Sequence, residues 1–127
     1  MKKIVATDNA PKAIGPYSQA NVIDCRQLVF VSGQVPIDPA VGKIVAQEIV
    51  GQSHQVIKNV KSILEAAGSD LNKALKTTVY LKDLAEFGKM NEVYGKFFGE
   101  KPPARATVEV SRLPRDAAIE IDLVAEI

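Results

Sequence analysis

Apolar residues recur with the spacing of an amphipathic helix in two segments of the chain. In residues 46–67 the members of one face recur at spacings of three and four, namely Ile49, Ser53, Val56, Ile57, Val60, Ile63, Leu64 and Ala67. Gly68 supplies a C-terminal stop for this helix. A second helix is predicted after Asp83, which can cap it with Glu86 as capping-box partner, and Gly99 ends it.

Other segments have the patterns of β-strands. Residues 74–81 alternate between apolar and polar side chains, which predicts a strand with one buried face. Residues 28–31 are continuously apolar, which predicts a strand buried on both faces. Shorter strands are predicted at residues 2–6 and 17–24. Proline and glycine mark residues 7–16 and 36–42 as loops.

Two further β-type runs stand near the C-terminus, at residues 102–110 and from Ile119 onward. They flank a turn-forming stretch at residues 111–116. An antiparallel hairpin centred near Leu113 would place Arg105 and Glu120 opposite each other or one step diagonal.

The order of elements predicts an α+β fold with a mixed or antiparallel sheet. Two helices can cover only one face of such a sheet. In the strand at residues 28–31, however, the side chains that point to either face are all apolar. We therefore expect another subunit to cover the second face, the alternative being that loops do so.

Composition narrows the class of protein. The 127 residues are enough for one domain, residues 1–127, with a core of its own, and 46% of them are hydrophobic. The net charge of +1 gives no electrostatic reason to expect nucleic acid or membrane as a partner. One cysteine and one histidine argue against an internal disulfide and against a zinc or iron–sulfur site, so no metal is expected. We expect a cytoplasmic protein, without a signal peptide or a membrane span.

Arg105 and Glu120 are the candidate chemical groups. A guanidinium can hold a small carboxylate bidentately, and a neighbouring carboxylate can handle a water or a proton. The alternative is a structural cross-strand ion pair. Glu109 shares the parity of Arg105 and is a rival partner, and the parity of Glu120 also fits a solvated surface carboxylate.

Three other residues have both a structural and a site interpretation. Asn91 lies on the apolar stripe of the second helix, so its amide needs hydrogen-bond partners, either in the backbone or in a site. Tyr17 follows a rigid turn and could offer its hydroxyl to a ligand or pack in the core. Gly33 stands at a strand end, where it could allow close approach of a ligand or mark a bulge.

Several spaced motifs resemble those of the RidA (YjgF) family of enamine/imine deaminases over essentially the whole chain. They are the segments at residues 13–20 (AIGPYSQA), 31–34 (VSGQ), 103–108 (PARATV) and 119–121 (IEI). The resemblance implies a chorismate-mutase-like α+β fold. It also implies a homotrimer with the sheets packed around the trimer axis and active sites between subunits.

The resemblance further implies a reaction and the residues that perform it. Imines such as 2-iminopropanoate, the tautomer of 2-aminoacrylate, and 2-iminobutanoate would be hydrolysed to 2-oxo acids and ammonia without a cofactor. These imines leave pyridoxal-phosphate-dependent dehydratases. By this resemblance Arg105 binds the substrate carboxylate, Glu120 positions and activates water, and Tyr17 closes the cleft. Gly33 and Thr107 contact the ligand through the main chain, and Asn91 lies near the pocket. Many relatives carry Cys where this chain has Thr107, which excludes thiol chemistry there.

Two other functions attach to such proteins. The Arg105 cleft could bind a 2-oxo acid and report it to a partner without catalysis. An endoribonuclease or translation inhibitor is disfavoured by the near-neutral charge, the single histidine and the lack of an aromatic stacking surface.

Overall fold

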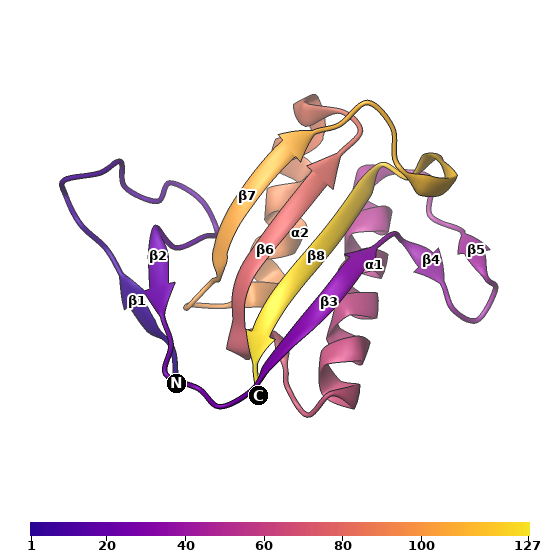
Figure 1. Cartoon of the computed structure of the whole chain (residues 1–127). Coiled ribbons are helices and arrows are strands. Elements are labelled where there is room, and N and C mark those ends of the chain that lie inside the picture. The colour runs from indigo at the N-terminus through magenta and orange to yellow at the C-terminus, as the bar shows by residue number, and fades with distance from the viewer.

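The computed structural model describes residues 1–127 (Figure 1). Eight strands and two α-helices follow one another, with short 3-10 turns at Leu71–Lys73, Leu84–Glu86 and Pro114–Asp116. The elements are β1 (Lys3–Val5), β2 (Ala20–Val22), β3 (Leu28–Gln34), β4 (Ile37–Asp38), β5 (Lys43–Ile44), α1 (Ile49–Ala66), β6 (Ala74–Leu81), α2 (Phe87–Phe98), β7 (Ala104–Glu109) and β8 (Ile119–Glu126).

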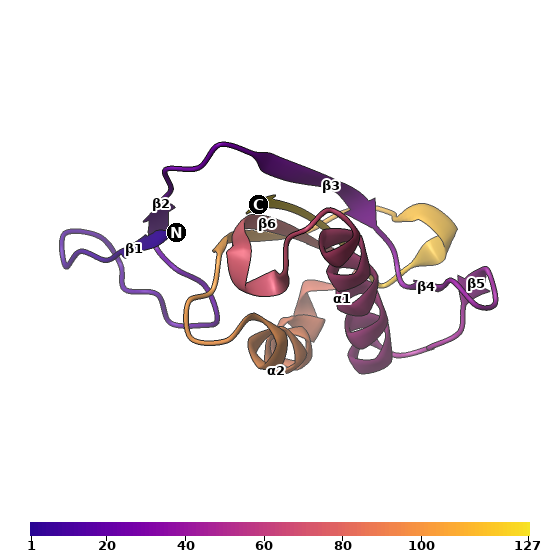
Figure 2. The ribbon, with the colours of Figure 1, turned by 90° about the horizontal axis from the view of Figure 1, so that it is seen from below.

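The main sheet has four strands in the order β3-β8-β6-β7. Strands β3, β8 and β6 pair antiparallel, whereas the edge strand β7 runs parallel to β6. Both helices lie on the same face of this sheet, and its other face has no helix over it (Figure 2). The predicted α+β class, with a mixed sheet and two helices on one face, is confirmed.

The core fills the space between the helices and the sheet. Alternate residues of β8 and β6 point into it, because successive side chains of a strand point to opposite faces. They meet the apolar stripes of the helices, and the largest fully buried side chains are Tyr94, Phe98, Ile57, Leu64, Leu81, Met90, Ile119, Ile121 and Leu123. The apolar faces predicted for the two helices are therefore the surfaces that pack against the sheet.

The element boundaries differ slightly from those predicted. The first helix begins at Ile49 because Glu48 is still extended, with φ of −115° and ψ of 159°. Asp83 does cap, accepting a hydrogen bond from the Ala85 amide at 2.9 Å, but it caps a 3-10 turn that precedes α2. Gly68 and Gly99 end the helices with positive φ of 85° and 68°, a conformation that favours glycine. A small hairpin, β4–β5, occupies part of the predicted 36–42 loop.

The predicted hairpin of the last two strands is wrong. Strand β6 lies between β7 and β8, so these neighbours in sequence do not pair. Arg105 is registered with Thr77 of β6, and Glu120 with Tyr80. Since Thr77 and Tyr80 differ by three positions, Arg105 and Glu120 point to opposite faces of the sheet. Strand spacing and rise put their Cα atoms roughly 14 Å apart.

The open face of the sheet carries exposed apolar side chains. Phe30 is 72% exposed and Val108 is 41% exposed on this side. Val29 and Val31 of the same β3 run face the helices, registered with the buried Ala125 and Leu123. The prediction that residues 28–31 are buried on both faces is therefore wrong for a single chain.

The N-terminal segment stands beside the edge strand β7 rather than in the main sheet (Figure 1). Its hairpin β1–β2 is a separate two-stranded sheet. Ser18 connects it to the chain before β7, because its amide donates to the Pro103 carbonyl at 3.1 Å and its hydroxyl to the Pro102 carbonyl. This connection brings Tyr17 close to Arg105. No helix of the chain has the length and apolar character needed to cross a membrane.

Candidate functional site

Arg105 lies on the helix-facing side of β7, inside a cage of aromatic rings. Its guanidinium carbon is 4.7 Å from the ring centre of Tyr94 and 5.5 Å from those of both Tyr17 and Phe87. Two of the rings come from α2 and the third from the N-terminal loop. Cation–π contacts of this kind hold a guanidinium in place without neutralising it.

Arg105 has one hydrogen-bond partner and no carboxylate partner in the chain. It donates from Nη1 to the Asn91 side-chain oxygen at 2.8 Å, and none of the ion pairs of the molecule involves it. Burial lowers the pKa of Arg105, while the nearby Tyr94 and Tyr17 act in the opposite direction. A partly buried cation without a counter-ion is a favourable place for a small anion, which Arg can grip through paired N–H groups.

A buried hydroxyl pair supports this cage from below. The Tyr94 and Thr77 hydroxyl oxygens are 2.7 Å apart, and both residues are fully buried. The Tyr94 ring stacks on Phe98 with centroids 4.3 Å apart. Burial raises the pKa of Tyr94 to about 12, so the phenol under the guanidinium stays neutral. The floor of the cage is therefore rigid and uncharged.

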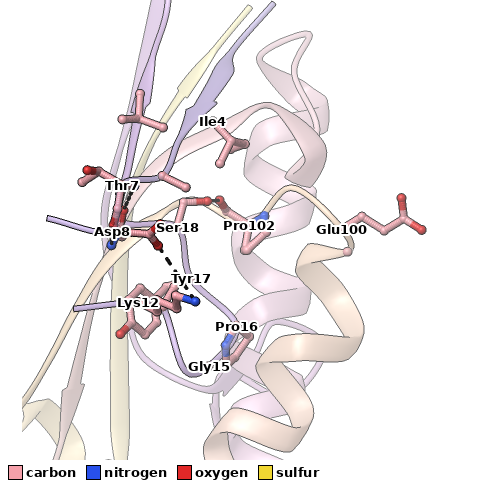
Figure 3. A pocket seen from close by; sticks show the side chains of 15 residues that line it. Ile4, Thr7, Asp8, Lys12, Gly15, Pro16, Tyr17, Ser18, Glu100 and Pro102 are labelled. Atoms are coloured by element: carbon pink, nitrogen blue, oxygen red, sulfur yellow. Dashed lines mark hydrogen bonds and ion pairs between the residues drawn. The ribbon is translucent and has the colours of Figure 1, made fainter. Parts of the chain in front are cut away.

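Tyr17 lies in a loop that is held together by hydrogen bonds of one glutamine side chain. The Gln19 side chain accepts from the Thr7 amide at 2.7 Å and donates to the carbonyls of Thr7 and Pro11. Behind Tyr17 lies an open hollow of about 600 Å³, bounded by residues 4–8 and by Gly99, Glu100 and Pro102 (Figure 3). Arg105 does not line this hollow, although its guanidinium lies 5.5 Å from the centre of the Tyr17 ring, so the hollow is separate from the surroundings of Arg105.

Glu120 lies on the open face, pressed against the backbone of β3. A Cβ atom added to Gly33 would overlap the Glu120 carboxylate, so a larger residue fits here only if the end of the Glu120 side chain moves away. The β3–β8 register shifts between Val31 and Gln34, which is the bulge that the glycine suggested as an alternative. Burial, and secondarily the nearby Asp122 carboxylate, raise the pKa of Glu120.

The structure thus divides the predicted site residues into two groups. Tyr17, Asn91 and Arg105 meet on the helix side, and Thr107 follows on the same face of β7, registered with the buried Val79. The Thr107 hydroxyl oxygen is inaccessible and has no hydrogen-bond partner. Gly33 and Glu120 meet on the opposite side of the sheet, out of reach of Arg105 within one chain.

Some residues around Arg105 were missed or misjudged by sequence reasoning. Glu109 is not its partner, because the Glu109 carboxylate accepts from the Leu84 amide at 2.9 Å. Phe87 and Tyr94 were not singled out as site residues, but both rings lie against the guanidinium. Their spacing of three and four from Asn91 on one helix stripe was the available signal.

Comparison with known proteins places the chain in a family. The family model described as Endoribonuclease L-PSP matches residues 7–127. A RutC family protein of Pyrococcus horikoshii is 57% identical over 98% of both chains. The chloroplastic Reactive Intermediate Deaminase A of Arabidopsis thaliana is 46% identical over 98% of this chain and 65% of that protein. The crystal structure of Escherichia coli TdcF with bound serine superposes with a TM-score of 0.76, at 41% identity and 98% coverage of each chain.

Fold and site together define a small α+β protein with a partly buried arginine that has no ion-pair partner in the chain. The match over nearly the whole length identifies it further: the chain belongs to the YjgF/RidA family, as its motifs indicated.

Proposed function

We propose that the protein hydrolyses reactive enamine and imine intermediates, including 2-iminopropanoate and 2-iminobutanoate, to 2-oxo acids and ammonia. The observation that carries this proposal is the partly buried Arg105 guanidinium, which has four N–H donors without a partner and no counter-ion. Two similar proteins support it, one named a reactive intermediate deaminase and the other crystallised with serine, itself a small carboxylate. The proposed setting is the cytoplasm, where pyridoxal-phosphate-dependent dehydratases would release the imines.

The proposed reaction needs little from the protein beyond orientation. Arg105 holds the substrate carboxylate, so the adjacent C=N carbon is fixed in place. The Glu120 carboxylate takes a proton from a water molecule, whose oxygen adds to that carbon. Protonation of the nitrogen and loss of ammonia then break the C–N bond as the C=O bond forms. A carboxylate with a raised pKa is a suitable base for such a step, because it accepts the proton of water more readily.

We further propose that each site forms between two subunits of a homotrimer. Within one chain Arg105 and Glu120 point to opposite sides of the sheet, so they cannot act on one substrate. The exposed Phe30 and the other apolar groups of the open face also favour cover by a second copy. Packing the sheets around a common axis would let Arg105 of one subunit face Glu120 of the next.

Activity is tested with threonine dehydratase as the source of imine, under conditions where spontaneous hydrolysis is slow. The wild-type protein should accelerate release of 2-oxobutanoate, and Arg105→Ala should abolish the effect. Arg112→Ala removes an equal charge from an exposed loop and serves as the control. No acceleration by the wild type would remove the proposal. Rates with the imine from serine, measured in parallel, give the preference for the side chain.

The shared site is tested by mixing two inactive variants. Arg105→Ala and Glu120→Ala subunits are unfolded together and refolded as mixed trimers. A site is intact only when one subunit supplies the arginine and its neighbour the glutamate, so about a quarter of the wild-type activity should return. Activity that stays absent in verified mixed trimers would contradict the shared site while leaving the reaction itself untouched.

A sensor of 2-oxo acids is the second candidate, because the same unpaired Arg105 would bind such a ligand. Calorimetry with 2-oxobutanoate separates the two functions, since tight binding without imine turnover favours the sensor. The description of the family model also makes RNA cleavage worth measuring. Cleavage that persists in the Arg105→Ala and Glu120→Ala variants would point away from this site.

A further inference from the structure

A second carboxylate and a phenol accompany Glu120 on the open face of the sheet. Glu120 and Asp122 stand two positions apart on β8, so their side chains point the same way. Tyr80 of β6 is registered directly with Glu120, while Asp122 is registered with Thr78. The Tyr80 hydroxyl reaches diagonally past Glu120 and donates to the Asp122 carboxylate at 2.9 Å.

This hydrogen bond fixes Asp122 where its charge acts on Glu120. All three side chains are partly buried, so solvent screens the two carboxylates less than it would on an open surface. The bond to Asp122 also raises the pKa of Tyr80, so the phenol keeps its proton and remains the donor. The two carboxylates therefore stay neighbours, although like charges side by side would otherwise turn apart.

Within one chain the other surroundings of Glu120 offer no compensating charge. On its β3 side it meets Gly33, between the uncharged Ser32 and Gln34. Lys82, which follows the last residue of β6, is paired with Asp116 at 2.7 Å.

Lys76 is the one cation within β6 itself. It is registered with Val124, two positions beyond Asp122. Within one chain Asp122 is therefore the only charged group placed to act on Glu120 at close range, whereas in the proposed trimer Arg105 of the neighbouring subunit would also face it.

We propose that Asp122, held by the Tyr80 hydroxyl, is a positioning residue that acts in addition to burial to raise the pH range in which Glu120 carries and exchanges a proton. The inference rests on the proposed function for its catalytic meaning, but the electrostatic coupling stands without it. A neighbouring negative charge disfavours the ionised form of Glu120, which makes Glu120 a stronger base for the attacking water.

The coupling is measured directly by following the Glu120 carboxyl carbon in an NMR pH titration of the full protein without substrate. Asp122→Asn keeps an oxygen for the Tyr80 hydroxyl but removes the charge, so the titration of Glu120 should move to lower pH. Glu65→Gln removes one carboxylate from an exposed ion pair on α1 and should leave it unchanged. An unchanged Glu120 titration in Asp122→Asn would overturn the proposal.

The pH dependence of kcat/KM for imine hydrolysis is the second readout. Its acid limb should move to lower pH in Asp122→Asn, while the rate on the plateau falls because the base is weaker. Tyr80→Phe should alter the acid limb in the wild-type background and have no further effect together with Asp122→Asn. Equal effects of Tyr80→Phe in both backgrounds would show that Tyr80 does not act through Asp122. A protein without deaminase activity that still shows the NMR shift would remove the proposed function and keep the coupling.

Discussion

Replacing Asn91 by aspartate should strengthen the fold and weaken ligand binding at the same time. The Asn91 side-chain oxygen accepts a hydrogen bond from Arg105 at 2.8 Å, and Arg105 has no anionic partner in the chain. The new carboxylate would have nearly the same shape and would supply the missing counter-ion from within. It would therefore compete with any carboxylate ligand for the same guanidinium.

The size of the effect follows from the geometry. Two unit charges about 4 Å apart interact by about 4 kcal/mol at the effective dielectric of a site near a protein surface. Loss of half to all of that attraction would reduce the affinity for a carboxylate ligand by about 30-fold to 700-fold. The hydrogen bond to Arg105 becomes charge-assisted, which should raise the free energy of unfolding by about 1 kcal/mol after the cost of burying the carboxylate.

Calorimetric titration with 2-oxobutanoate and urea unfolding measure the two effects separately. Binding should recover as the pH falls and the introduced carboxylate is protonated. Gln47→Glu adds the same charge at an exposed position before α1 and should change neither quantity appreciably. Undiminished binding by Asn91→Asp at neutral pH would refute the assignment of Arg105 as the anion anchor.

Three further outcomes are expected. Gly33→Ala should change the free energy of unfolding by less than about 1 kcal/mol, because only the mobile end of the Glu120 side chain must move. The displaced carboxylate should nevertheless sharply lower kcat/KM for imine hydrolysis. A fully active variant would contradict the role of Glu120. Thr77→Val and Tyr94→Phe should each lower the free energy of unfolding in urea by about 1–3 kcal/mol, because each leaves a buried hydroxyl without its partner. The double variant should lose less than the sum of the two single losses, and strict additivity would exclude a hydrogen bond between them. Folding raises the pKa of Glu120, so ionisation of this carboxyl destabilises the native state as the pH rises above the usual carboxyl range. The free energy of unfolding of Glu120→Gln should therefore exceed that of the wild type at neutral pH and equal it in acid.

Local patterns in the sequence carry most of the secondary structure. The alternation of residues 74–81 matches β6, and the three-and-four spacing located both helices to within a few residues. Pairing between strands was less accessible, because the runs around Leu113 look the same whether they pair with each other or with a third strand. Strand β6, from earlier in the chain, lies between β7 and β8. A crossover through α2 connects β6 to β7, as a parallel pair of strands requires.

The surroundings of each candidate residue were harder to predict than the residues themselves. The sequence left Asn91 with two interpretations, and the structure gives it Arg105 as a hydrogen-bond partner. That contact joins α2 to β7 and depends on how the helix sits over the sheet. The diagonal bond from Tyr80 to Asp122 likewise depends on the register of two strands 42 residues apart in sequence.

The place of β8 in the sheet has a consequence for biosynthesis. This strand is made after the other strands of its sheet, yet it lies between β3 and β6 and supplies Ile119, Ile121 and Leu123 to the core. Until it leaves the ribosome, β3 has no neighbour in the sheet and the apolar faces of both helices have only part of their cover. The sheet of the nascent chain should therefore form late and in one step, once β8 can enter between β3 and β6.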